Sequence, residues 1–245
     1  MSETLLKIEG LGKRFGGFVA LEGIDVEVRA GERLGLIGPN GSGKSTLVNC
    51  ICGTLHNEQG SVSFAGTAID GLPAYQRTRL GLARSFQLPR PFRSMTVKQN
   101  LRVPILYTVN ARSGTHLGER AIEERSAELL GLVGLEDKAD KRPRDLTQIE
   151  MRKLELARAM AAEPKLLLAD ESMAGLSHSE VDDILVVLHR LVEQGLAIVL
   201  IEHIMRAVMS FSERLVVLVA GRKIADGEPQ EVIRNPEVER AYLGE

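Results

Sequence analysis

The sequence predicts an α/β protein in which a mixed, largely parallel sheet is combined with an N-terminal antiparallel β subdomain and an inserted α-helical subdomain. Three observations support this fold class. Short strand patterns with Gly-rich turns fill the first third of the chain, helical patterns fill its middle, and strands alternate with helices over its last third. A parallel sheet of this kind places its functional groups at the carboxyl ends of its strands.

The first third contains three segments in which apolar and polar residues alternate, at residues 5–11, 25–30 and 61–66. Residues 33–38 form a more continuous apolar run and predict a buried strand. A Gly-rich loop follows this run, and residues 46–53 continue it as a helix. We therefore expect a strand, a loop and a helix in direct succession.

The middle of the chain, residues 88–160, is expected to form the helical subdomain. Apolar residues recur at helical spacing within residues 119–135, and another helix is expected over about residues 147–162. The flanking segments, 1–87 and 161–245, are then expected to build the core and the β subdomain, so that the whole chain is one domain.

The last third alternates buried strands with helices. Residues 165–170, 196–203 and 214–221 are apolar enough for strands that are buried on both faces. Residues 178–195 have the pattern of an amphipathic helix that ends at Gly195. Strands separated by helices predict parallel pairing through right-handed crossovers.

Composition excludes several classes of protein. The net charge of −2 argues against a nucleic-acid-binding protein, which usually has a basic surface. No apolar run approaches the ~18 residues that cross a bilayer, and the beginning, MSETLLKIEG, lacks the apolar stretch of a signal peptide. We expect a cytoplasmic chain whose role at a membrane depends on a partner. Cys50 and Cys52 are expected to be reduced and buried, with a metal or redox role as the alternative.

The most specific motif lies between the strand at 33–38 and the helix that follows it. It matches G-x-x-x-x-G-K-[ST], which binds phosphate in this context, with backbone N–H groups and the helix N-terminus directed at the anion. Lys44 is expected to reach the β- and γ-phosphates and Ser45 to hold Mg²⁺. The alternative is a Gly-rich turn with a surface lysine. This phosphate-binding loop consists of Gly38, Pro39, Asn40, Gly41, Ser42, Gly43, Lys44, Ser45 and Thr46.

A second motif ends the strand at residues 165–170. Asp170 is placed to bind Mg²⁺ directly or through water, and Glu171 can act as general base on an attacking water. The alternative for Glu171 is a solvated carboxylate at a strand end. His203 ends the next strand and could contact the γ-phosphate, although a lone histidine there is more often structural.

The order of these motifs resembles that of ATP-binding cassette proteins, which have a P-loop NTPase core, over essentially the whole chain. The resemblance rests on the phosphate-binding loop, ARSFQLPRPF with its Gln87, the helix LELARAM, and the strands LLLADE and IEH. It implies that Gln87 contacts Mg²⁺, that His203 is the switch residue, and that an aromatic residue stacks on adenine. Phe15 fits this stacking role, Phe18 competes for it, and core packing is the alternative for both.

Longer segments, including RSFQLPRPFRSMTVKQNL and the C-terminal ERAYLGE, resemble the ATP-binding subunits that energise uptake of branched-chain amino acids or of related amides and urea. The resemblance implies ATP and Mg²⁺ as ligands, a second cassette and two transmembrane permease subunits as partners, and an extracytoplasmic solute-binding protein as an indirect partner. It also implies a peripheral position on the inner face of the cell membrane.

The sequence departs from this family in its signature segment, which usually reads Leu-Ser-Gly-Gly-Gln or Leu-Ser-Tyr-Gly-Gln. Here the chain has Leu-Thr-Gln-Ile-Glu at residues 146–150. Thr147 and Glu150 form a capping box that specifies the helix start. Ile149 prevents the close backbone approach that glycine allows, and the Glu150 carboxylate repels a phosphate at the same helix start. We expect this signature to be degenerate and the second cassette to be a different chain.

Two smaller departures are Ser172, where proline is usual, and Ser177, where Asp or Asn is frequent. Either could weaken coupling between two sites, or be neutral.

Three other functions share the phosphate-binding loop. A soluble cassette ATPase of DNA repair or translation usually has long insertions or two cassettes in one chain, which this chain lacks. A cassette with little hydrolysis is compatible with the altered signature. A small-molecule kinase would leave Gln87, His203 and the LELARAM helix without a purpose.

Overall fold

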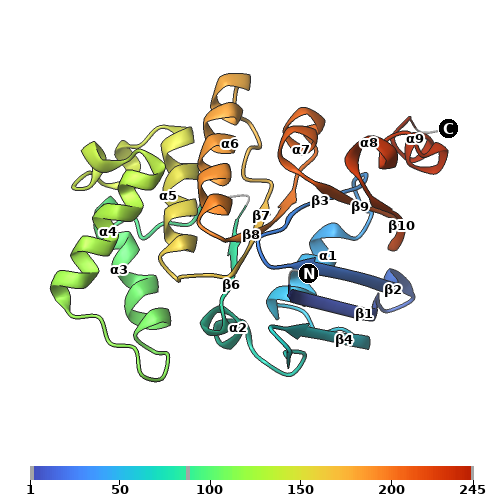
Figure 1. The fold of residues 1–245 in the computed structure, drawn as a ribbon, viewed down its shortest axis with the longest axis horizontal. Coiled ribbons are helices and arrows are strands. Elements are labelled where there is room, and N and C mark those ends of the chain that lie inside the picture. Colours follow the sequence, from blue (N-terminus) through green and yellow to red (C-terminus); the bar gives the residue numbers. More distant parts are fainter. Residues whose placement is uncertain (1–2, 87–88, 244–245) are drawn as a thin grey trace.

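A computed structural model describes residues 3–86 and 89–243, the last two of these as backbone only, and shows two sheets and a group of helices (Figure 1). The first sheet has four antiparallel strands in the order β2-β1-β4-β5. A turn at Gly16 and Gly17 joins its two long strands, because glycine readily adopts the positive φ of +59° found at Gly16. The strands are β1 (Thr4–Phe15), β2 (Phe18–Arg29), β4 (Gln59–Phe64) and β5 (Thr67–Ala68).

The second sheet has six strands in the order β10-β9-β3-β8-β7-β6. Its central strands pair in parallel, and β10 pairs with β9 in antiparallel fashion through a tight turn. The predicted α/β fold class, with a mixed and largely parallel sheet and an antiparallel N-terminal part, is confirmed. The strands are β3 (Arg33–Ile37), β6 (Leu82–Ser85), β7 (Leu166–Asp170), β8 (Ala197–Ile201), β9 (Arg214–Val219) and β10 (Arg222–Gly227).

Helices supply every regular element described between β6 and β7, and they gather on one side of the molecule (Figure 1). The first begins at a capping box formed by Thr96 and Gln99 and continues past Pro104 as a π-helix. These elements are α3 (Val97–Pro104), η1 (Ile105–Val109), α4 (Glu119–Val133), η2 (Glu136–Lys138), η3 (Pro143–Asp145) and α5 (Gln148–Met160).

The remaining helices connect the strands. The longest, α6, begins at a capping box formed by Ser177 and Glu180 and buries one apolar face. No helix within the described residues is both long and apolar enough to span a bilayer. These helices are α1 (Lys44–Cys52), α2 (Ala74–Leu80), α6 (His178–Glu193), α7 (Met205–Phe211), α8 (Pro229–Val232) and α9 (Pro236–Leu243).

Two large apolar clusters cover the two faces of the six-stranded sheet. Successive side chains of each strand point to opposite faces of the sheet. In β7, Leu166 and Leu168 belong to the cluster shared with the antiparallel sheet and α1. Leu167 and Ala169 belong to the cluster shared with α5 and α6. Burial on both faces explains why these strands read as continuous apolar runs. Cys50 and Cys52 are buried and form no disulfide, and burial raises the pKa of Cys52 to about 11.

Candidate functional site

Three parallel strands, β3, β7 and β8, end at one edge of the sheet. Leu36 of β3 pairs with Ile201 of β8, which pairs in turn with Asp170 of β7. The phosphate-binding loop follows β3, Asp170 ends β7, and His203 follows β8. Elements that are far apart in the sequence are therefore brought to the edge at which parallel sheets carry their ligands.

Two glycines are required by the close packing of the phosphate-binding loop. Gly38 has φ +153°, and a Cβ there would lie 2.1 Å from the carbonyl oxygen of Leu218. Gly43 has φ +103°, and its Cβ would lie 2.8 Å from the carbonyl oxygen of Ala20. Gly43 is also the N-cap of α1 and provides no side-chain cap, so the first N–H groups of α1 are available to an anion.

The side chain of Lys44 folds back over the phosphate-binding loop. Its ammonium donates hydrogen bonds to the carbonyl oxygens of Gly38 at 2.7 Å and Pro39 at 3.1 Å. Burial lowers the pKa of Lys44, and the negative charges of Glu171 and Asp170 oppose this effect. A phosphate bound against the loop would stabilise the same cation further.

A cavity of about 240 Å³ is enclosed by the loop, the side chain of Glu171 and the β1–β2 hairpin. Phe15 and Phe18 face each other across this hairpin, 48% and 64% exposed. Phe18 lines the cavity, whereas the Phe15 ring lies under the ammonium of Lys13 at 5.4 Å. Of the two aromatic candidates, Phe18 is thus the one at the cavity wall. The cavity is lined by Phe18, Ala20, Asn40, Gly41, Ser42, Gly43, Lys44, Ser45, Thr46 and Glu171.

Asp170 is buried and forms an ion pair of 2.5 Å with Arg84 of β6. The same guanidinium donates a hydrogen bond of 2.7 Å to the side-chain oxygen of Asn49 in α1. Arg84 was not predicted as a site residue, because its contact with Asp170 depends on β6 pairing beside β7.

The oxygen donors at this edge fit a magnesium ion that is bound together with a phosphate ligand. Ser45 lines the cavity, and Asp170 ends β7, which is separated from β3 by β8. Across the part of the chain that the structure describes, no group of three or more His, Cys, Asp or Glu residues could hold a metal alone. Mg²⁺ commonly uses one or two carboxylates and completes its coordination with substrate phosphates and water. Gln87, the third predicted ligand, lies outside the described residues.

Glu171 occupies an uncommon backbone conformation. Its φ is +46°, and its N–H donates a hydrogen bond of 2.9 Å to the carbonyl oxygen of Ile201 in the neighbouring strand. Such conformations occur mainly where the surrounding structure enforces them, often at functional sites. The bond to β8 fixes Glu171 at the wall of the cavity that Lys44 and Ser45 also line.

Glu202 is a further charged residue at this edge that the sequence analysis missed. It is 1% exposed, and its Oε1 accepts a hydrogen bond of 2.8 Å from the N–H of Met173. Burial raises the pKa of Glu202 to about 7, and the charge of Glu171 contributes in the same direction. Arg152 of α5 donates to the carbonyl oxygen of Ala174, so two buried side chains hold the segment after Glu171. The neighbouring His203 is exposed.

The altered signature segment forms the start of α5. The predicted capping box is confirmed: Oγ1 of Thr147 accepts from the N–H of Glu150, and Oε2 of Glu150 accepts from the N–H of Thr147 at 2.8 Å. The bond from Thr147 lowers the pKa of Glu150, and Lys138 lies 3.5 Å from its carboxylate. Ile149 is half-buried against the apolar cluster of the helices. Both altered residues thus contribute to the local structure of the helix start.

Ser172 and Ser177, the two smaller departures from the family, differ in their surroundings. Ser177 is the N-cap of α6, a position where Asp or Asn would serve equally well. Ser172 is 3% exposed, and its hydroxyl has no hydrogen-bond partner among the described residues.

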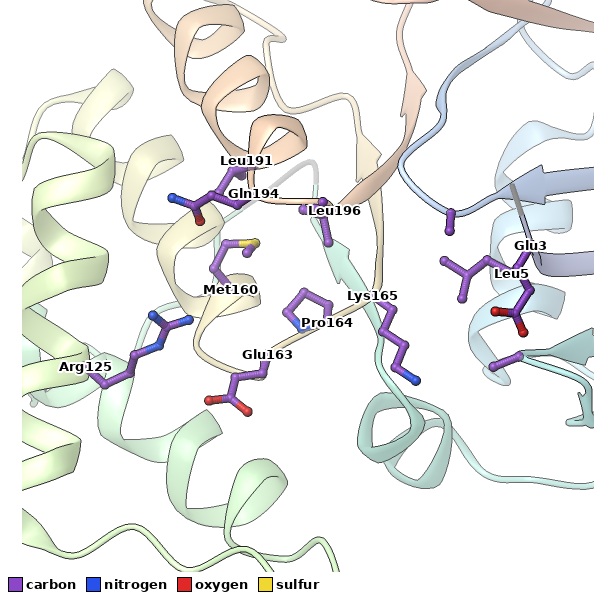
Figure 2. Close-up of a pocket in the computed structure, with 13 residues that line it drawn as sticks. Glu3, Leu5, Arg125, Met160, Glu163, Pro164, Lys165, Leu191, Gln194 and Leu196 are labelled. Carbon is purple, nitrogen blue, oxygen red and sulfur yellow. The ribbon is translucent and has the colours of Figure 1, made fainter. Parts of the chain in front are cut away.

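A larger cavity, about 500 Å³, lies at the opposite ends of the strands (Figure 2). Lys165 and Leu196, which precede β7 and β8, line it together with Arg125 and Met160 from the helices. Figure 2 shows Leu5 of β1 and the preceding Glu3 on its other side. This cavity does not contain any residue of the predicted site.

Comparison with known protein families agrees with this geometry. The family model described as ABC transporter matches residues 21–174, which include the phosphate-binding loop, Asp170 and Glu171. The chain belongs to the ABC transporter family. A second model, described as branched-chain amino acid ATP-binding cassette transporter, matches residues 222–245 of this cassette.

Relatives of the cassette are similar over their full length. It is 37% identical to the high-affinity branched-chain amino acid transport ATP-binding protein BraF of Pseudomonas aeruginosa and 38% identical to LivG, a protein of the same description, of Salmonella typhimurium, with all of each chain covered. The crystal structure of the ADP conformation of MJ1267, an ATP-binding cassette of an ABC transporter, superposes with a TM-score of 0.87 at 30% identity, covering all of both chains. The cassette is therefore an ATP-binding subunit of the transporter type, a family of ATPases.

Proposed function

We propose that the cassette hydrolyses ATP in the cavity between the phosphate-binding loop and Glu171. The observation that carries this proposal is that the loop, Lys44, Ser45 and Glu171 line one cavity at the strand ends where Asp170 also lies. A Gly-rich turn without a phosphate-binding role would not be expected to share a cavity with a carboxylate from a strand distant in the sequence.

In the proposed reaction, the phosphates of ATP lie against the loop, with Lys44 near the β- and γ-phosphates. Glu171 accepts a proton from water as the water oxygen attacks the γ-phosphorus. The bond to the bridging oxygen of ADP breaks, and ADP and phosphate are released. His203 is the candidate for contacting the γ-phosphate, and Phe18 or Phe15 for stacking on adenine. When bound, Mg²⁺ neutralises phosphate charge, and Ser45, Asp170 and Gln87 are the residues proposed to hold it.

The solute is proposed to be a branched-chain amino acid or a related amide or urea compound. The match of residues 222–245 and the names of the full-length relatives support the amino-acid assignment. The complex would contain a second cassette, two transmembrane permease subunits and, outside the membrane, a solute-binding protein. The cassette would then lie at the cytoplasmic face of the membrane, with residues 1–87 and 161–245 as its core and 88–160 as its helical subdomain.

A groove of about 350 Å³ beside Arg84 is the proposed contact site for a permease subunit. Phe86, Phe92 and Tyr107 line it, and each is exposed, Tyr107 to 72%. Arg158 of α5 lies over the Phe92 ring at 5.2 Å, which ties one wall of the groove to the helix that starts at the signature segment. Exposed aromatic side chains in a groove are typical of interaction sites.

The test is the ATPase and uptake activity of the assembled transporter in proteoliposomes. Glu171→Gln should abolish ATP-dependent uptake and reduce steady-state hydrolysis while nucleotide still binds. Leucine, isoleucine, valine and urea would be compared as solutes. The partner cassette is inactivated in both complexes that are compared. Hydrolysis at the same rate with Glu171→Gln as with the unchanged chain would contradict the proposed role of Glu171 as general base.

We further propose that the signature segment of this chain supports hydrolysis poorly at the partner's site. The Glu150 carboxylate is bonded to the N–H of Thr147 at the start of α5, where a phosphate would meet its negative charge. A complex with a different cassette would then have one competent site, made of this chain's loop and the partner's signature. Ile149→Gly combined with Glu150→Gln should increase turnover of the assembled transporter. An unchanged turnover would refute the idea.

A further inference from the structure

The side chain of Arg84 makes several contacts in addition to the backbone pairing of its strand. Its guanidinium pairs with Asp170 at 2.5 Å and with Asn49 at 2.7 Å, and it lies over the ring of Phe86 at 5.1 Å. Its side chain is only 15% exposed. The contacts join β6 to two other elements, because Asp170 ends β7 and Asn49 belongs to α1, the helix after the phosphate-binding loop. Phe86, which follows β6, lines the groove.

We propose that Arg84 is a positioning residue that orients the Asp170 carboxylate toward the metal of the nucleotide. The inference rests on the proposed nucleotide site. One oxygen of Asp170, Oδ2, accepts a hydrogen bond from Arg84, so rotation of the carboxylate is restricted. Partners that orient a ligating carboxylate in this way typically change metal affinity 10–100-fold when removed.

The guanidinium is itself fixed in place from several sides. Asn49 accepts a hydrogen bond from one of its nitrogens, and its central carbon lies over the Phe86 ring. Lysine could not replace all of these contacts, because its single ammonium lacks the two separate nitrogens that bond Asn49 and Asp170. The Phe86 contact also means that Arg84 touches the groove proposed for the permease, so the orientation of Asp170 is linked to that surface.

The experiment measures equilibrium binding of a fluorescent ATP analogue to the purified full chain, over a range of Mg²⁺ concentrations and in EDTA. Arg84→Met should leave the affinity in EDTA unchanged and shift the Mg²⁺ concentration needed for tight binding upward by about 10–100-fold. Arg84→Lys and Asn49→Ala should give smaller shifts in the same direction. Arg112→Met is the matched control, because Arg112 is also paired with a carboxylate, that of Glu163 at 3.2 Å. Glu163 lines the cavity at the opposite ends of the strands from the loop.

An Mg²⁺ dependence of Arg84→Met identical to that of the wild type would overturn the inference. If circular dichroism shows that Arg84→Met does not fold, Arg84→Lys and Asn49→Ala replace it in the test. An unchanged Mg²⁺ dependence in both of these variants would then overturn the inference. A merely structural role would lower affinity in EDTA and in Mg²⁺ alike, and that result would also overturn it. Absence of Mg²⁺-dependent binding by the wild-type chain would instead refute the proposed nucleotide site.

Discussion

Replacing Glu202 by glutamine should change how the stability of the cassette depends on pH. Burial raises the pKa of this carboxyl from 4.5 to about 7 in the folded state. Because one pKa unit corresponds to about 1.4 kcal/mol, ionised Glu202 costs the folded state about 3 kcal/mol relative to the unfolded chain. The side chain is 1% exposed, so solvent screening does not reduce this figure substantially.

The sign follows from proton binding. Between pH 4.5 and 7 the unfolded chain has released the Glu202 proton while the folded chain still holds it, so the free energy of unfolding falls as pH rises through this range. Above pH 7 the contribution is constant. Glutamine carries no such proton, and its side-chain oxygen can still accept from the N–H of Met173.

The assay is urea unfolding followed by far-UV circular dichroism at intervals between pH 4.5 and 8. The difference in unfolding free energy between Glu202→Gln and the wild type should move by about 3 kcal/mol in favour of the variant as pH rises across this range. Other carboxylates cancel in the difference. Glu171→Gln is the control and should retain most of the wild-type pH dependence, because burial rather than Glu171 is the main cause of the raised pKa. Parallel pH curves for Glu202→Gln and the wild type would refute the reasoning.

Three further substitutions test the fold around the site by the same unfolding assay. Gly35→Ala should destabilise by about 1–3 kcal/mol, because its Cβ would lie 2.4 Å from Cδ2 of Leu215; no loss would show that β3 can shift. Arg77→Met should lower the free energy of unfolding by at least about 3 kcal/mol, because this buried guanidinium donates four hydrogen bonds to carbonyls at the end of α1 and in the loop before α2. The control is Arg120→Met, at an exposed arginine, and an equal loss of stability in the two variants would contradict the prediction. Thr147→Ala should cost about 1 kcal/mol through loss of the cap, and an unchanged midpoint would show that the cap does not contribute.

The strands and the phosphate-binding loop could be predicted because their signals are local. A buried parallel strand needs a short apolar run, and the loop needs glycine where the backbone of Gly38 meets Leu218. The fold class followed from the order of these signals. The strand β6 was missed because it is short and contains Arg84 and Ser85, and α2 was missed because its one buried residue is the charged Arg77.

The candidate site was predictable only in the parts that lie within a motif. Arg84 meets Asp170 because β6 pairs with β7, and Glu202 meets Met173 because β8 lies beside the segment that follows β7. Local sequence patterns do not show which strands pair. They also predict that a charged residue lies at the surface, even where it is buried. Likewise, the choice between Phe15 and Phe18 depends on which side of the hairpin borders the cavity.

The most direct test of the nucleotide site is the affinity of the purified chain for ATP with Mg²⁺, measured by calorimetry for the wild type and for Lys44→Ala. Loss of the charged hydrogen bonds from Lys44 should weaken binding by about 10–100-fold. Lys165→Ala, at the opposite ends of the strands, should leave the affinity unchanged. Equal affinities for wild type and Lys44→Ala, or no Mg²⁺-dependent binding by the wild type, would contradict the assignment of the phosphate-binding loop.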